Sequence, residues 1–262
     1  MKFSIVTVCF NSLSTIRDTI TSVLNQTMLP YEYIIVDGQS TDGTLCVIEE
    51  YKDEFAKKNI WLKVLSEPDD GLYDAMNKGI ELAKGDVIGI VNSDDWYEPN
   101  TIENANDVFE KDKKIGIVHG LMRRIRHDGY SYLMAGKDIK RLRYYMCLNH
   151  PTFMVKKNVY EELGVFNTSY KLSADYDFTL RAYLAGVEFY KIDYIMSNMR
   201  LGGVSDLRYK EGLKEKVIIQ KQNGISSFSY ILSYIAFYIK HCLINILVKY
   251  DINYQKIIKK KI

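Results

Sequence analysis

The sequence predicts an α/β protein with a mainly parallel sheet and helices on both faces. Strand-like runs alternate with segments of helical spacing through the first half of the chain, which is the order of parallel strands joined by crossover helices. The run at 86–91 is almost continuously apolar and rich in β-branched residues, as expected for a strand buried on both faces. Hydrophobic residues make up 47% of the 262-residue chain and charged residues 26%, the balance of a folded globular protein.

The first half of the chain is predicted to contain four strands separated by three helices. Segment 13–25 is expected to be helical because its apolar residues, from Ile16 to Leu24, recur at helical spacing. The strands are expected at 3–9, 33–36, 61–65 and 87–91, and the other two helices at 44–55 and 73–83.

The pattern loosens in the second half. Segment 175–184 is predicted to be an amphipathic helix that carries the apolar residues Phe178, Leu180, Ala182 and Leu184. The other expected elements are a helix at 101–109, a strand at 115–120, a hairpin at 122–135, a basic connection at 137–148, a strand at 153–155, a helix at 159–163 and a strand at 189–192.

Composition and missing motifs exclude several classes of protein. A net charge of +2 is too small to make nucleic acid the main partner, so none is expected. The four cysteines lie far apart without a CxxC pair, which argues for buried thiols in a reducing compartment. Segment 38–44 lacks the lysine of a P-loop, and no GxGxxG, GxSxG or HExxH motif occurs. The N-terminal apolar run is too short for a signal peptide, so we expect a cytoplasmic location.

The C-terminal segment 225–248 is dense in Ile, Leu, Phe and Tyr and is followed by several lysines. Its length approaches that of a membrane span, but Lys240 and two other polar residues interrupt its middle. We therefore expect an interfacial helix on the inner face of the cell membrane. The alternatives are a helix that packs on its own chain, a helix that packs against a second subunit in a homo-oligomer, and a true membrane span. The chain is expected to consist of a domain at 1–205 and a helical extension at 206–262. The domain is expected to have two halves, at 1–98 and 99–205.

Polar residues follow each of the first four predicted strands. They are Asn11, Asp37, Asp69 and the adjacent pair Asp94 and Asp95. Ligands bind at the carboxyl ends of the strands in open α/β sheets, so these residues are expected to form one rim. Two neighbouring carboxylates repel each other, and a cation bound beside them offsets that repulsion. The pair therefore favours a divalent-metal site that holds a phosphorylated ligand. The alternative is a solvated, Asp-rich turn.

A second pair of carboxylates, Asp175 and Asp177, lies at the start of the helix predicted at 175–184. The helix dipole and the free backbone N–H groups stabilise negative charge at this end, so either residue could simply cap the helix. The functional alternative is a general base on the far side of the substrate from the metal.

An ordered series of motifs resembles the inverting glycosyltransferases of family 2, which have the GT-A fold. The resemblance runs from Ser4 to about Ser205, and its motifs are 5–11, 35–44, 66–79, 92–95, 150–153, 174–177 and 202–205. The QxxRW-type motif of processive, polymerising members is absent, so transfer of one sugar per encounter is expected.

The resemblance implies transfer of a single sugar, with inversion, from a nucleotide-sugar of the UDP type to a glycan acceptor. Asp175 would be the catalytic base, Asp95 would bind Mg²⁺ or Mn²⁺ directly, and Asp94 would contact the ribose or a metal-bound water. The residues implied at the donor are Thr7, Asn11, Asp37, Asp69, Asp74, Asn77, Lys78 and Ser93. Those implied on the sugar or acceptor side are Trp96, His150 and Asp177. With the C-terminal segment, a lipid-linked acceptor of surface polysaccharide assembly is expected.

The chain departs from the family pattern at two positions. Ser93 stands where a third acid is common, so direct metal coordination is expected to depend on Asp95. Ala174 replaces the Glu that often precedes the base, which keeps Asp177 as an alternative to Asp175.

Two other function classes are alternatives. A sugar nucleotidyltransferase shares the sheet and a carboxylate site, but it usually has a basic, Gly-rich loop after its first strand, and segment 9–13 offers none. A non-catalytic nucleotide-sugar-binding module would keep the pocket without turnover, and the intact Asp95 and Asp175 count against it.

Overall fold

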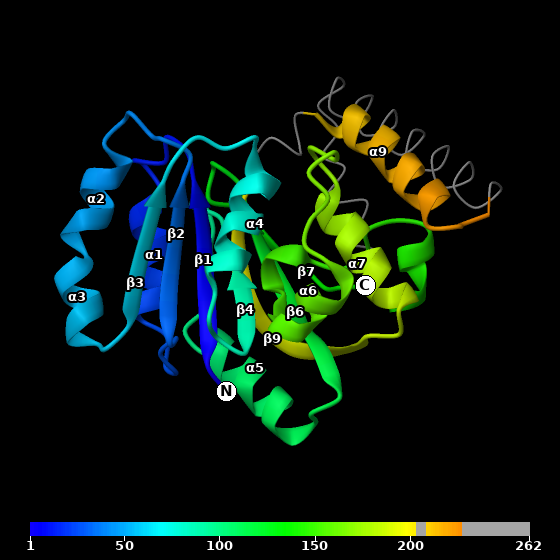
Figure 1. The fold of residues 1–262 in the computed structure, drawn as a ribbon, viewed down its shortest axis with the longest axis horizontal. Helices are drawn as coiled ribbons and strands as arrows, with labels where there is room; N and C mark the ends of the chain where they lie inside the picture. The colour runs from blue at the N-terminus through cyan, green and yellow to red at the C-terminus, as the bar shows by residue number, and fades with distance from the viewer. Residues whose placement is uncertain (203–207, 227–262) are drawn as a thin grey trace.

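The computed structural model describes residues 1–202 and 208–226 and confirms the predicted fold class (Figure 1). The described strands form one sheet in the order β3-β2-β1-β4-β8-β6-β9-β5, with β7 paired to β6. The motif residues 203–205 and the interfacial helix expected at 225–248, from residue 227 onward, lie outside the described residues. In the part of the chain that is described, no helix has the length and apolar character needed to cross a membrane.

The N-terminal half builds the parallel part of the sheet, as predicted. Strand β1 lies between β2 and β4 and pairs with both in parallel, and β2 pairs in parallel with β3. Side chains on β1, β2 and β4 are buried throughout, which explains their continuous apolar sequences. The strands are β1 (Phe3–Cys9), β2 (Glu32–Asp37), β3 (Trp61–Ser66) and β4 (Val87–Ile90), and the helices are α1 (Ile16–Leu24), α2 (Thr44–Glu50), α3 (Lys52–Lys57) and α4 (Leu72–Leu82).

The helix predicted at 44–55 is divided into α2 and α3. The helical path breaks at Tyr51, and the second piece brings the buried Phe55 to 5.2 Å from the ring of Tyr33 in β2. The pairing of Phe55 with Tyr33 is a tertiary contact, which the helical periodicity of the sequence does not record.

The second half is longer and more extended than predicted. The strand expected at 115–120 continues to Ile125, and the one expected at 189–192 runs from 188 to 200, because the two pair in parallel along most of their length. A further strand, β5, pairs with β9. The elements are β5 (Trp96–Tyr97), α5 (Thr101–Lys111), β6 (Ile115–Ile125), β7 (Ser131–Met134), η1 (Ile139–Arg143), η2 (His150–Thr152), β8 (Met154–Lys156), α6 (Lys157–Leu163), α7 (Ala174–Leu184), β9 (Glu188–Arg200) and α9 (Tyr209–Gln222).

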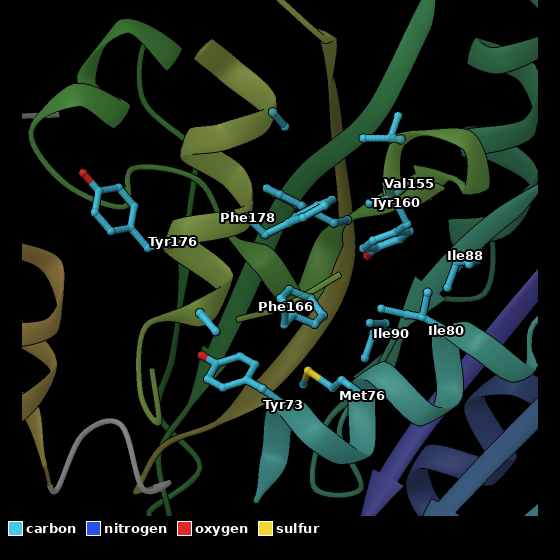
Figure 2. Packing of buried hydrophobic residues seen from close by; sticks show 14 of the residues in the cluster. Tyr73, Met76, Ile80, Ile88, Ile90, Val155, Tyr160, Phe166, Tyr176 and Phe178 are labelled. Carbon is cyan, nitrogen blue, oxygen red and sulfur yellow. The ribbon is translucent and has the colours of Figure 1, made fainter. Parts of the chain in front are cut away.

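Helix α7 is buried almost all round, so its prediction as an amphipathic helix was wrong. The helix itself is present, but α6, η1 and α9 pack against it and cover the sides that a surface helix would expose to water. Its Phe178 stacks on Tyr160 with ring centroids 4.6 Å apart, and Phe166 packs edge-on against both rings (Figure 2). This aromatic cluster fixes α7 beside the sheet, and Asp175 lies in the first turn of that helix.

Replacement of Phe178 by Ala is expected to lower the free energy of unfolding by about 4 kcal/mol, because a fully buried ring leaves a cavity. Leu184→Ala, at the end of the same helix where the side chain is 39% exposed, should cost less than about 1 kcal/mol. Denaturation in urea measures both values, and equal losses would contradict the described packing of α7.

Candidate active site

A cleft of about 730 Å³ opens at the carboxyl ends of β1, β3 and β4. Three of the four strand ends expected to form a rim therefore do so, and the end of β2 does not line the cleft. The opposite wall comes from the loop before α7 and from the end of β9. The lining residues used below are Asn11, Asp69, Tyr73, Asp74, Ser93, Asp94, Asp95, Thr168, Tyr170, Lys171, Leu172, Arg200 and Arg208.

Two adjacent carboxylates, Asp94 and Asp95, lie in the cleft directly after β4. Asp95 is only 1% exposed, and its Oδ1 accepts a hydrogen bond of 3.1 Å from the backbone N–H of Arg200. Burial raises the pKa of Asp94, and burial followed by the charge of Asp94 raises the pKa of Asp95 well above its usual range. Keeping both carboxylates ionised therefore costs free energy, and a bound cation would offset that cost.

Arg200 holds this acidic loop, and its role was missed in the sequence. Its Nη1 donates a hydrogen bond of 2.6 Å to the backbone oxygen of Asp94, and its Nη2 forms an ion pair with Asp18. The guanidinium lies 4.5 Å from the ring centroid of Trp96. Trp96, expected on the sugar side, therefore packs on Arg200 and does not line the cleft. The one available signal was the position of Arg200, just before the motif at 202–205.

The residues at the end of β4 fit a divalent cation bound together with a ligand. Among the described residues, no group of three His, Cys, Asp or Glu side chains comes together as a protein-only metal site. Mg²⁺ is typically held by one or two carboxylates plus phosphate oxygens and water, which matches a pair of carboxylates in an open cleft. The buried Oδ1 of Asn92, which also lines the cleft, has no hydrogen-bond partner in the described structure. Asp95 and Asp94 would hold the cation, and it would stabilise negative charge on a diphosphate.

Four of the expected donor residues line the cleft: Asn11, Asp69, Asp74 and Ser93. Asn11 adopts a left-handed conformation (φ 49°) and its Oδ1 accepts a 2.9 Å hydrogen bond from the N–H of Thr41. The carboxylate of Asp69 accepts a 2.9 Å hydrogen bond from the N–H of Gly71. These local bonds hold the loops after β1 and β3 in one conformation.

Thr7 and Asp37 lie beneath the cleft and not on its surface. Both are fully buried, and Thr7 accepts a hydrogen bond of 2.8 Å from the hydroxyl of Tyr33. Asp37 accepts hydrogen bonds from the N–H of Ser40 at 3.0 Å and from the hydroxyl of Ser66 at 2.7 Å. These bonds tie β1, β2 and β3 together.

Asn77 and Lys78 do not line the cleft, and both bind other parts of the protein. The side chain of Asn77 donates to the backbone oxygen of Phe166 at 2.8 Å and accepts from its N–H at 3.0 Å. The ammonium of Lys78 donates to the backbone oxygen of Pro68 at 2.7 Å and pairs with Glu67 at 2.9 Å. Both residues therefore support loops that border the cleft.

The two candidate bases have different partners. Asp175 Oδ1 accepts a 3.1 Å hydrogen bond from the hydroxyl of Tyr73, a cleft residue that the sequence analysis did not single out. Asp177 is buried and forms a 2.9 Å ion pair with Arg181, which also binds three backbone oxygens at 163–165. Neither carboxylate is among the residues that line the cleft. Asp177 is engaged inside the protein, whereas Asp175 binds the cleft residue Tyr73.

His150 belongs to the aromatic packing behind Asp175. Its ring lies 5.3 Å from Phe153 and 5.5 Å from Phe166, and burial lowers its pKa despite the nearby charge of Asp175. A neutral, buried imidazole at this position supports the wall, and it is not among the residues that line the cleft.

The α/β sheet with its cleft at the strand ends matches the GT-A fold. The profile of Glycosyl transferase family 2 matches residues 4–166, more than half of the chain. The chain therefore belongs to glycosyl transferase family 2, and it is a glycosyltransferase that takes its sugar from a nucleotide-sugar. The alternative of a sugar nucleotidyltransferase is left without support.

Named relatives agree with this assignment. A PGL/p-HBAD biosynthesis glycosyltransferase of Mycobacterium bovis is 27% identical over 229 residues, which cover 85% of this chain and 86% of the relative. A hyaluronan synthase of Pasteurella multocida is 29% identical over 87% of this chain, but this chain spans only 24% of that protein.

Solved structures share the fold. S. aureus TarS 1-349 in complex with UDP-GlcNAc superposes with a TM-score of 0.65 at 20% identity, covering 84% of this chain and 66% of TarS 1-349. The mannosyltransferase PcManGT from Pyrobaculum calidifontis, in complex with GDP-Man and Mn²⁺, gives a TM-score of 0.62 at 17% identity, covering 82% of this chain and 62% of PcManGT. At such identities the likeness is one of fold, and this chain spans about two thirds of each solved chain.

Because Asn77 makes two buried hydrogen bonds, Asn77→Ala is expected to lower the free energy of unfolding by about 2 kcal/mol. UDP affinity, measured by calorimetry, should stay within about twofold of the wild type. The exposed Asn158→Ala is the matched control and should change neither quantity. A tenfold loss of UDP affinity at unchanged stability would return Asn77 to the donor site.

Proposed function

We propose that this enzyme transfers one sugar from a UDP-sugar to a glycan acceptor with inversion, using a divalent cation held by Asp95. The observation that carries the proposal is the pair of adjacent carboxylates after β4, the half-buried Asp94 and the buried Asp95. They line the same cleft as Tyr73, which binds Asp175. An anionic diphosphate on one side and a carboxylate base on the other match the needs of a single displacement.

The proposed reaction divides its charges between the two sides of the cleft. Asp175 accepts the proton of the acceptor hydroxyl while that oxygen attacks the anomeric carbon from the face opposite the diphosphate. Tyr73 keeps one oxygen of Asp175 occupied as a hydrogen-bond acceptor, which leaves the other oxygen for the proton. A bound Mg²⁺ or Mn²⁺ would stabilise the charge that develops on the leaving diphosphate. One protein carboxylate then carries out the proton chemistry, unlike the two of a glycoside hydrolase.

The proposed acceptor is a lipid-linked glycan at the inner face of the membrane. Two observations support it: the relative named for PGL/p-HBAD biosynthesis covers most of the chain, and the sequence after residue 226 is apolar and ends in lysines. The proposed protein has a transferase domain at 1–205 and an extension at 206–262. The extension would attach the protein to the membrane surface as a peripheral protein. A homo-oligomer formed through the same extension is also part of the proposal.

Asp175→Asn is expected to lower turnover of the donor about a thousandfold, because the amide cannot accept the proton. UDP release from a panel of UDP-sugars with Mn²⁺ measures turnover, and calorimetry with UDP should show unchanged stoichiometry and affinity. Asp177→Asn is the matched variant on the same helix: it should lose about 3 kcal/mol of stability with its ion pair but keep its turnover per UDP-binding molecule.

Full turnover in Asp175→Asn together with its loss in Asp177→Asn would move the base to Asp177. UDP-sugar binding without turnover in the wild type, across the whole panel and with lipid-linked acceptors, would instead favour a non-catalytic binding module.

A further inference from the structure

Helix α9 contacts a loop that lines the cleft, although the helix lies outside the segment matched by the family. It packs beside α7 (Figure 1), and its Glu215 faces the loop that precedes α7. Residues 168, 170, 171 and 172 of this loop line the cleft, and we call segment 168–172 the acceptor wall.

Both carboxylate oxygens of Glu215 bind the backbone of the acceptor wall. Oε1 accepts a 2.8 Å hydrogen bond from the N–H of Lys171, and Oε2 accepts a 2.9 Å hydrogen bond from the N–H of Leu172. Two consecutive N–H groups directed at one carboxylate leave the peptide between them little freedom to rotate, and bonds to a charged acceptor are stronger than neutral ones. Glu215 thus sets the path of the wall at two successive residues.

The same path leads directly to the proposed base. The next residue, Ser173, is buried and donates a 3.3 Å hydrogen bond to the backbone oxygen of Gly212 in α9. Asp175 follows two residues later in the first turn of α7. On the other side, the ammonium of Lys171 donates a 3.0 Å hydrogen bond to the backbone oxygen of Asp70, across the cleft. The wall is therefore held from behind by α9 and in front by the donor-side loop.

The attachment of α9 to the protein does not depend on Glu215. Ile219 is fully buried, and Gln220, which is 1% exposed, donates hydrogen bonds of 2.6 Å to the backbone oxygen of Tyr144 and 3.0 Å to the hydroxyl of Tyr176. Glu215 lies one turn earlier and binds the wall. Its removal should free the wall and leave the helix in place.

We infer that α9 is part of the acceptor side of the active site and that Glu215 is a positioning residue for the acceptor wall and, through Ser173, for Asp175. That Glu215 holds the segment 168–172 depends only on its hydrogen bonds. That this segment belongs to the acceptor side, and that Asp175 is positioned through it as the base, rests on the proposed function.

The test compares Glu215→Ala and Glu215→Gln with Glu161→Ala, an exposed glutamate of α6, in the full chain. Hydrogen exchange of the Lys171 and Leu172 amides should become at least about tenfold faster in Glu215→Ala, because both lose their acceptor. Glu215→Gln keeps one acceptor oxygen and should give an intermediate rate. Glu161→Ala should match the wild type.

Activity separates positioning from mere stability. The assay measures UDP release from a UDP-sugar that the wild type turns over. In Glu215→Ala, kcat should fall about tenfold, while the KM for the donor and the stoichiometry of UDP binding stay unchanged. A variant that only lost folded protein would bind proportionally less UDP. Partial rescue of kcat in Glu215→Gln is expected as well.

Unchanged exchange at both amides would overturn the inference whatever the activity, and so would faster exchange with unchanged kcat. Failure of the proposed function would give a different result: Asp175→Asn would keep its turnover, or the wild type would turn over no donor. In either case the hydrogen exchange of Lys171 and Leu172 alone would decide whether Glu215 holds the acceptor wall.

Discussion

Two adjacent carboxylates after one strand, one half-buried and one buried, impose the main constraint on this structure. Asp95 lies in the loop after β4, and burial together with the neighbouring charge of Asp94 disfavours its ionised form. The fold offsets this cost with Arg200, whose backbone N–H binds Asp95 and whose guanidinium binds the backbone of Asp94. Arg200 ends β9, so the long parallel pairing of β6 with β9 also places the group that holds the acidic loop.

The cleft is assembled from parts with different origins in the chain. The parallel strands β1, β3 and β4 bring their loops to one edge, because parallel strands end on the same side of a sheet. The opposite wall depends on packing far apart in sequence: the aromatic cluster around Phe178 places α7, and α9 holds the loop before it. This division matches the proposed chemistry, with a diphosphate on the sheet side and an acceptor on the helix side.

The sequence predicted what local chemistry determines and missed what distant contacts determine. The strands up to β4 and the acids that follow them were predictable from apolar runs that end in polar residues. The buried bonds of Asp37 to Ser66 and of Asn77 to Phe166 were not, because each partner lies in another element. The same holds for the full length of β9 and for the burial of α7. The resemblance to a family indicated which residues gather near the cleft. Which of these residues line the cleft and which support its walls depends on contacts between distant elements.

Unfolding of the wild type and Asp95→Asn, each in EDTA and in Mn²⁺ with UDP, tests the central claim most directly. The asparagine keeps the oxygen that binds Arg200 but removes a buried charge beside Asp94. In EDTA the variant should therefore be more stable by about 1 kcal/mol. With Mn²⁺ and UDP at about a hundredfold excess over Kd, the wild type should gain about 2.7 kcal/mol and the variant far less. A variant that is destabilised in EDTA, or that gains as much as the wild type, would contradict a metal site at Asp95.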